Sequence, residues 1–246
     1  MKVWLLLKRD VYLFTATCYK RFSVTVCCLL LLVFFQHTVR PHDSALALVQ
    51  AVFRGFSRES HYTFPIYWLS FHLASSLIVS NQWRRDLLWG STTRFMNGYA
   101  RWEVWCSKLL LIGFSTFLFT STYFGLILIF TSLIPSVPAL SFVDVRVFLL
   151  IYSIQLLVTF VLHVLYVVCN LVLPAVFSFL IMIVWLSMTA LLNVPYNPFN
   201  LSLTNRLVAT PALHVIALLA LSILLALAGS IIFKNKEIIS QKENSE

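Results

Sequence analysis

Long apolar stretches alternate along the chain with short segments that hold nearly all of its charged residues. A bilayer core about 30 Å thick needs about 20 apolar residues in helical form. The pattern predicts six membrane-spanning helices, at residues 22–39, 62–80, 107–133, 145–168, 170–193 and 209–233. The fourth and fifth divide one run without charge, which would be about 70 Å long as a single helix. Asn170 and Pro174 are the expected turn residues, because proline removes a backbone donor and disfavours helix just before it.

Two of the segments outside these spans show helical spacing of their own. Residues 1–21 have one apolar face, formed by Trp4, Leu7, Val11, Phe14 and Cys18. Lys2 and Arg9 lie towards the other side, which predicts an amphipathic helix in the membrane interface with its cations near anionic headgroups. The alternative is a positive flank that only sets orientation. A second apolar stripe, from Ala45 to Phe56, predicts a helix on the opposite surface.

The loop between the second and third spans is long and basic. Four of its residues fall at i, i+4, i+7 and i+11, on one helical face: Phe95, Tyr99, Trp102 and Cys106. A second face with a similar period is polar and basic: Arg94, Asn97, Arg101 and Lys108. These patterns predict a short basic amphipathic helix that runs into the third span. It either docks a cytoplasmic partner or lies in the interface and serves topology only.

Composition and charge place the chain in a membrane and orient it there. Hydrophobic residues make up 60% and charged residues 11%, against roughly 25% charged residues in soluble domains. This composition excludes disorder and a nucleic-acid-binding surface, so the net charge of +9 bears on orientation instead. Six spans put both termini on one side, which leaves five of the 18 Lys and Arg residues on the other: Arg40, Arg54, Arg58, Arg146 and Arg206. Both termini are therefore expected in the cytoplasm, with residues 1–246 as a single membrane domain that ends in a cytoplasmic tail at 234–246.

The chain carries little of the chemistry that marks an enzyme or an ion-coupled carrier. Every Asp and Glu lies outside the predicted spans or at a boundary, whereas intramembrane carboxylates usually mark proton and ion pathways. The sequence contains no P-loop, HExxH or Gly-x-Ser-x-Gly motif. We therefore expect neither catalysis nor ATP hydrolysis by this chain itself. Three span histidines, His72, His163 and His214, are better explained as hydrogen-bonded packing residues than as metal or haem ligands, so we expect no metal and no cofactor bound by the chain.

A polar stripe follows the fourth span at i, i+4, i+8, i+11 and i+15, within one helical sector. Its members are Gln155, Thr159, His163, Tyr166 and Asn170. The third span adds Thr116, Thr120 and Tyr123 at similar spacing. Such a surface faces either other helices, a partner subunit or a translocation path, and hydrogen bonding between helices is as good an explanation as transport. The last outer loop, residues 194–211, contains prolines and asparagines that predict turns or a short re-entrant segment packed against other spans.

This layout resembles the permease subunit of a type-2 ATP-binding-cassette exporter. The shared features are the amphipathic N-terminal helix, six spans, cytoplasmic termini, the basic helical loop and the tight turn between spans four and five. In that family the loop between spans two and three carries a coupling helix that docks on the ATPase. The stretch from Arg94 to Lys108 is similar to the family's Arg-x-x-Trp-x-x-x-Lys pattern, with the tryptophan shifted by one. The resemblance implies that the residues docking the ATPase are Arg94, Tyr99, Arg101, Trp102, Glu103, Trp105 and Lys108.

The resemblance further implies transport of an amphipathic peptide or lipid-like cargo, driven by a separate ATPase that binds ATP and magnesium. It is closest to small permeases of Gram-positive bacteria that export peptides or confer self-protection against antimicrobial peptides. The implied partners are the ATPase subunit, a second permease in a homo- or heterodimer and the lipid of a bacterial plasma membrane, with no nucleic acid. The alternative function is a non-catalytic membrane protein for binding, immunity or assembly that acts without ATP.

Overall fold

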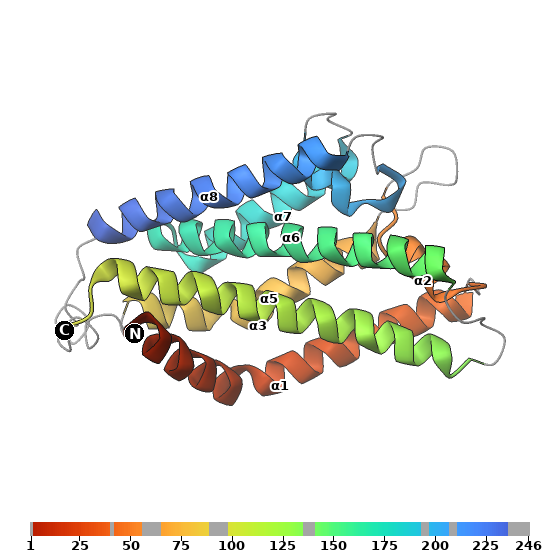
Figure 1. Cartoon of the computed structure of the whole chain (residues 1–246), viewed down its shortest axis with the longest axis horizontal. Helices are drawn as coiled ribbons and strands as arrows, with labels where there is room; N and C mark the ends of the chain where they lie inside the picture. Colours follow the sequence, from red (N-terminus) through yellow and green to blue (C-terminus); the bar gives the residue numbers. More distant parts are fainter. Residues whose placement is uncertain are drawn as a thin grey trace.

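The computed structural model describes residues 2–39, 42–55, 65–88, 98–134, 141–192, 197–206 and 211–235. Every regular element in these ranges is helical (Figure 1). The α-helices are α1 (Lys2–Val39), α2 (Ala45–Val52), α3 (Ile66–Leu88), α5 (Arg101–Ser132), α6 (Phe142–Val172), α7 (Ala175–Leu191) and α8 (Pro211–Asn235). Two 3-10 helices, η1 (Pro198–Ser202) and η2 (Thr204–Arg206), precede α8.

Four of these helices, α1, α5, α6 and α8, are long and apolar enough to cross a membrane. Two shorter apolar helices accompany them, α7 and the stretch Ile66–Ile78 of α3. The helices run along a common long axis, with α6 between α5 and α8 (Figure 1). An all-helical protein with four candidate membrane-spanning helices is therefore confirmed, and the apolar stretches of the sequence account for its long elements.

The first helix differs from the expected pair of an interfacial helix and a separate span. Residues 2–39 form one helix, and Figure 1 shows that it bends part-way, so that its first half runs obliquely to the bundle. The first half has a buried face with a period of four, formed by Leu6, Asp10, Phe14 and Cys18. Two residues of the expected lipid-facing stripe, Phe14 and Cys18, thus pack against protein, while Trp4 remains 68% exposed. Contacts with the neighbouring helices have replaced lipid as the environment of this face.

Helices α1 and α5 lie side by side and run in the same direction. Asp10 pairs with Lys108 near the start of both helices. Further along, the Phe22 and Phe119 rings have centroids 6.3 Å apart, and those of Phe34 and Phe130 lie 6.0 Å apart. The sequence offset between partners stays nearly constant along this pairing, so the two helices remain in contact over most of their length.

Pro174 separates α6 from α7. Helix α6 continues through Val172, Leu173 is extended, and Pro174 is the N-cap of α7. The turn therefore lies at Leu173–Pro174, while Asn170, the other expected turn residue, stays inside the last turn of α6. The ring of Pro174 explains this position, because the residue before a proline avoids helical geometry.

The basic segment before α5 is not one helix from 94 to 108. Its residues 94–97 lie outside the described ranges, Gly98 has φ of 73°, and α5 begins only at Arg101. Glu103 Oε2 accepts a hydrogen bond from the Ala100 backbone N–H at 2.8 Å and so closes the first turn of α5. Tyr99 therefore does not share a helical face with Trp102 and Cys106, because it lies before the N-cap of α5 at Ala100.

The two ends of the bundle are each tied together by contacts between distant segments. At one end, the Lys2 Nζ atom donates to the Gly98 carbonyl at 3.3 Å, next to the start of α5. At the other end, the expected surface helix forms as α2, capped by the Ser44 hydroxyl, which accepts from the Ala47 N–H at 3.1 Å. Its apolar stripe is buried, and the Phe53 ring after it stacks on Phe124 of α5 at 5.5 Å.

Candidate functional site

The polar stripe of α6 lies inside the bundle. All five of its members are buried, with exposed fractions of 4% or less: Gln155, Thr159, His163, Tyr166 and Asn170. Three of them contact polar side chains or backbone of α3, α5 and η1. We call these three, Gln155, Thr159 and His163, together with their hydrogen-bonded partners, the polar column.

His163 joins three helices at the end of the polar column opposite Gln155. Its Nδ1 lies 2.9 Å from the Thr116 hydroxyl of α5, and its Nε2 lies 3.2 Å from the Ser75 hydroxyl of α3. Both hydroxyls also approach backbone carbonyls of their own helices, at 2.8 Å for Thr116 and for Ser75. A neutral imidazole has one donor and one acceptor nitrogen. One of the two hydroxyls must therefore donate to the ring instead of to its carbonyl, which leaves this junction with two alternative hydrogen-bond patterns.

The next level of the polar column contains the second buried histidine. The Thr159 hydroxyl lies 3.1 Å from His72 Nδ1. The His72 ring is held by edge-to-face contacts with Trp68 and Phe71 of its own helix, with centroids 5.2 and 5.1 Å apart. These contacts fix the imidazole between α3 and α6, as expected for a packing histidine in a helix bundle.

The end of the polar column at Gln155 is closed by η1. Gln155 Nε2 donates to the Ser202 carbonyl at 2.6 Å, and Trp68 Nε1 donates to the Ser202 hydroxyl at 2.9 Å. The Ser202 hydroxyl in turn donates to the Phe199 carbonyl at 2.7 Å. Residues of the last loop thus reach into the bundle and satisfy polar groups of α3 and α6, in agreement with the expected packing of this loop against other spans.

The remaining candidates for a translocation path fall into two groups. Thr116 joins the polar column, whereas Tyr123 packs among the rings of Phe53, Phe71 and Phe124. Thr120 and Asn170 are buried, and within the described residues the Thr120 hydroxyl and the Asn170 amide have no hydrogen-bond partner. Tyr166 is buried in the apolar core. The sequence pattern therefore identified the buried face correctly but did not separate side chains that form a network from those that only pack.

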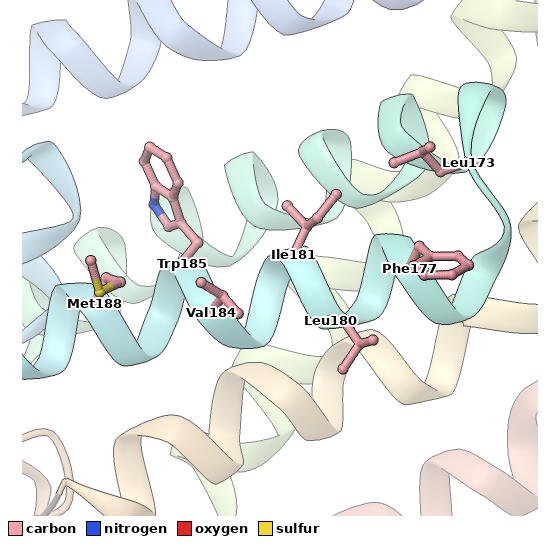
Figure 2. A pocket seen from close by; sticks show the side chains of 7 residues that line it. All are labelled: Leu173, Phe177, Leu180, Ile181, Val184, Trp185 and Met188. Atoms are coloured by element: carbon pink, nitrogen blue, oxygen red, sulfur yellow. The ribbon is translucent and has the colours of Figure 1, made fainter.

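An apolar groove of about 580 Å³ lies along α7, away from the polar column. Figure 2 shows side chains that project from α7 and the turn before it. They are Leu173, Phe177, Leu180, Ile181, Val184, Trp185 and Met188. A groove with this lining on a membrane helix suits lipid chains, and nothing polar in it would bind a charged group.

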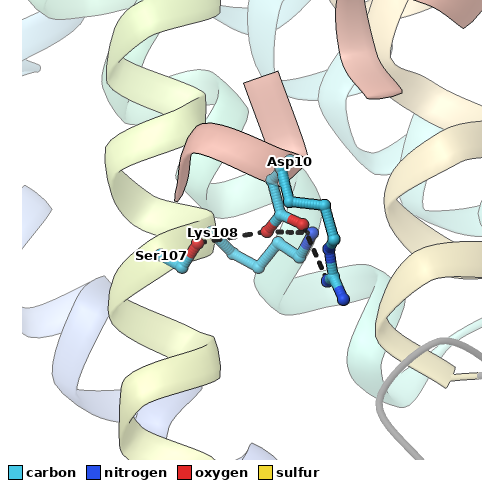
Figure 3. A network of polar contacts seen from close by, with 4 residues as sticks. Asp10, Ser107 and Lys108 are labelled. Atoms are coloured by element: carbon cyan, nitrogen blue, oxygen red, sulfur yellow. Dashed lines mark hydrogen bonds and ion pairs between the residues drawn. The ribbon is translucent and has the colours of Figure 1, made fainter. Parts of the chain in front are cut away.

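The base of α5, which we define as residues 101–108, holds most of the residues expected to dock an ATPase. Lys108 is fully buried and its ammonium group lies 2.8 Å from Asp10 Oδ2. The Ser107 hydroxyl donates to the same oxygen at 3.1 Å, and Figure 3 shows this carboxylate between α1 and α5. Arg9 approaches the other oxygen of Asp10 at 3.0 Å. A buried ammonium group cannot contact another subunit directly, so Lys108 is a structural residue in this arrangement.

Arg101 and Trp105 also face the protein. Arg101 Nη1 donates to the backbone carbonyls of Phe233 and Lys234, at the C-terminal end of α8. A cation at this position neutralises the partial negative charge of the helix end. Trp105 is 2% exposed, and its Nε1 donates to the Ala226 carbonyl at 2.9 Å. The base of α5 therefore holds the end of α8 on one side and the first half of α1 on the other.

The outward surface of the base of α5 is formed by the residues between these contacts. Trp102 is 59% exposed, while Glu103 and Tyr99 are half-buried and Glu103 is engaged in capping the helix. Arg94 lies outside the described residues. Trp102 is thus the aromatic residue of the expected docking set that remains accessible to another protein.

Asp10 and Arg206 are charged residues with contacts inside the protein, and the sequence pattern did not single them out. Asp10 lies on the buried i, i+4 face of α1. Its position on this otherwise apolar face could have predicted that the carboxylate points inwards. Arg206 donates to the Thr189 and Ala190 carbonyls at the end of α7, at 2.7 and 2.8 Å. Burial lowers the pKa of the Arg206 guanidinium group from its usual value, although the group remains a cation at neutral pH.

The described residues contain no group of three or more His, Cys, Asp or Glu side chains that would hold a metal ion. In comparisons with known proteins, no family model, no curated protein and no solved structure matches the chain. The function is therefore inferred from the geometry of the polar column and of the base of α5.

Proposed function

We propose that the chain is the membrane-spanning subunit of an ATP-driven exporter and works with a separate ATPase that binds ATP and magnesium. The observation that supports this proposal most strongly is the set of contacts that the base of α5 makes with two other helices. Arg101 and Trp105 hold α8, and Lys108 holds α1, so a push on this point would move the first and last helices together. A coupling element needs such mechanical contact with the rest of the membrane domain.

The distribution of helices and charge supports the same proposal. Helices α1, α3, α5, α6, α7 and α8 supply six apolar segments for six spans. The start of α1, the start of α5 and the end of α8 lie at one end of the bundle (Figure 1). Cations of this end include Lys2, Lys8 and Arg101, which favours a cytoplasmic location by the positive-inside rule. In a bacterial plasma membrane, the ATPase would bind this end.

The cargo class follows from the uncharged interior. The polar column consists of hydroxyl, amide and imidazole groups, and the outer faces of α7 and α8 are apolar. This combination suits an amphipathic peptide or a lipid-like molecule better than an ion. We propose that cargo passes between this chain and a second permease, because the direct hydrogen bonds of the polar column fill the interior of the single chain.

The same filling favours one alternative. A protein that binds a partner in the membrane without ATP, such as an immunity or assembly protein, needs no path through its interior. Such a protein would use the base of α5 only to hold its own helices.

Co-purification separates the two proposals. The tagged chain, extracted from its own host with a mild detergent, is expected to recover an ATP-binding-cassette ATPase that mass spectrometry identifies. The substitution Trp102→Ala should lower this recovery at least about fivefold. Truncating an aromatic residue at a protein–protein contact often costs about 1–2 kcal/mol of binding free energy or more. Wild-type membrane levels of the variant would show that insertion is intact.

Trp185→Ala is the matched control, because Trp185 is an exposed tryptophan on α7, 45% accessible and far along the chain from the base of α5. This variant should recover as much ATPase as the wild type. If the wild-type chain never recovers an ATPase, the exporter proposal fails and the ATP-independent alternative stands. Equal recovery with Trp102→Ala would remove Trp102 from the docking surface.

A further inference from the structure

The segment of residues 197–206, which contains η1 and η2, is buried to an unusual degree for a connection between two spans. Five consecutive residues, from Phe199 to Leu203, are exposed by 3% or less. Connecting segments normally run over the surface, and irregular backbone at membrane depth is tolerated only where protein surrounds it. This segment therefore occupies space inside the outer end of the bundle.

Its inner side is held by polar contacts with the bundle. The Ser202 carbonyl and hydroxyl accept hydrogen bonds from Gln155 and Trp68. The Phe199 ring packs edge-on against Trp185 of α7, with centroids 6.0 Å apart. Gln155 is the outermost member of the polar column, so the segment sits directly on the end of that column.

Its outer side is clasped by two other elements. The Thr204 backbone N–H donates to the Phe53 carbonyl at 2.9 Å, next to α2. The Asn205 amide bonds the Gly55 backbone twice, accepting from its N–H at 2.7 Å and donating to its carbonyl at 3.2 Å. A side chain at Gly55 would overlap the Asn205 amide. Arg206 completes the clasp at the end of α7.

We propose that residues 197–206 are a plug that closes the outer end of the polar column and leaves its seat as a unit. The inference rests on the proposed function, in which this end faces outside the cell. Apart from the backbone hydrogen bond between Thr204 and Phe53, the contacts that seat the plug are hydrogen bonds of side chains and ring contacts, so it can leave without unwinding any of the long helices. Gln155 connects it to α6, and His163 on the same helix contacts Thr116 of α5. A shift of α5 against α6 therefore reaches the contact that seats the plug.

The test measures how fast a buried position in the plug becomes accessible from outside. Leu201→Cys places a thiol at a site that is 1% exposed and has a side chain without hydrogen bonds to lose. Asp43→Cys is the accessible reference at the same end of the bundle, since Asp43 is exposed. Intact cells are treated with a membrane-impermeant maleimide, and the wild-type chain, with its five native cysteines, gives the background.

The plug predicts that Leu201→Cys reacts at less than about one tenth of the rate of Asp43→Cys, because only the open form reacts. Adding Gln155→Leu should raise the rate of Leu201→Cys about fivefold to tenfold, since one buried hydrogen bond of the seat is lost. Ser153→Ala is the matched control on α6: Ser153 is exposed and bonds only the Leu149 carbonyl among its described contacts. It should leave the rate unchanged.

An oxidised Gly55→Cys/Asn205→Cys pair, which ties the plug to the α2 end, should suppress labelling of Leu201→Cys until a reductant is added.

Two results would overturn the plug. Labelling of Leu201→Cys as fast as Asp43→Cys would mean that the segment is not seated. No labelling of Leu201→Cys, even with Gln155→Leu, would mean that it is fixed packing. Labelling of Asp43→Cys only in inverted membranes would instead contradict the orientation in the proposed function, and the ratio of the two rates on that face would still decide the plug.

Discussion

At the scale of single residues, Gly229 sets how closely α8 approaches α5. The indole ring of Trp105 lies where a Cβ atom of residue 229 would be, and Val168 of α6 crowds the same position. The Trp105 N–H reaches the Ala226 carbonyl across this gap. Small residues allow this kind of close contact between membrane helices. The glycine is therefore required by the neighbouring ring rather than by its own backbone conformation.

Replacing Gly229 by alanine should destabilise the protein by about 1–3 kcal/mol, the usual cost of overpacking a core. For a chain of this size, that cost lowers the apparent melting temperature by roughly 3–10 °C. The melting curve in detergent can be followed by tryptophan fluorescence. Gly125→Ala is the control, because a Cβ at Gly125 in α5 meets nothing within 4 Å. Equal melting temperatures for the two variants would contradict the tight contact.

The sequence predicted the burial of polar residues better than it predicted their partners. Gln155 and His163 interrupt an apolar helix at regular spacing, and polar groups avoid lipid, so their inward orientation follows from the pattern. Trp105 gave no such signal, because a tryptophan near the end of a span suits an interface, a docking surface or a core equally well. Its contact depends on Gly229, which lies 124 positions further along the chain, and no local rule connects the two.

At the scale of elements, α1 is held to α5 by a buried ion pair. The side chains of Asp10 and Lys108 are both fully buried, and Ser107 adds a hydrogen bond to the carboxylate. Removing one member of a buried pair leaves the other charge in an apolar site, which is costly, whereas replacing both by apolar residues often costs little. The pair therefore fixes which stretch of α1 faces α5 more than it adds net stability.

Asp10→Ala and Lys108→Met should each destabilise the protein by about 3–5 kcal/mol. The double variant Asp10→Leu/Lys108→Met should recover more than half of that loss. Arg9→Ala is the control, because Arg9 contacts the same carboxylate but its side chain is 43% exposed, and exposed pairs contribute about 0–1 kcal/mol. Unfolding midpoints of the wild type and the four variants give the comparison. A double variant as unstable as the two losses combined would rule out a role in register alone.

Helix positions were predictable where the sequence has a strong local signal, such as a proline or an apolar stripe at helical spacing. Pro174 ended α6, and the apolar stripe from Ala45 predicted α2. Two predicted helix boundaries differ from the structure, for different physical reasons. The helix expected from residue 94 begins only at Arg101, after Gly98 in a left-handed conformation that the helical spacing of its neighbours concealed. The expected division of α1 near residue 21 is absent because the buried face continues from Cys18 to Val26 and beyond.

At the scale of the whole molecule, charge and helix direction agree on one polarity. The start of α1 and the start of α5 lie at the same end, where Lys2 and Arg101 are placed, while Asp43, Arg146 and Arg206 lie at the other. The six spans of the proposed function would require this arrangement of the termini. Long-range contacts then fix it, because Arg101 holds the end of α8 and Asp10 of α1 reaches the base of α5.

Reporter fusions test this polarity. Green fluorescent protein fused after residue 246 should fluoresce, and alkaline phosphatase fused there should be inactive, because both report a cytoplasmic C-terminus. Phosphatase fused after residue 43 should be active as a control for the opposite face. An active phosphatase at residue 246 would exclude an even number of spans with a cytoplasmic N-terminus.

The ion pair between Asp10 and Lys108 also sets an order of events during synthesis. The two residues are 98 positions apart, and a ribosome adds about 5–20 residues per second. Asp10 therefore emerges roughly 5–20 s before Lys108. During this interval the carboxylate must stay hydrated at the membrane surface, because its final site does not exist until α5 has inserted. The first helix to be made thus takes its final seat only after α5 is in place.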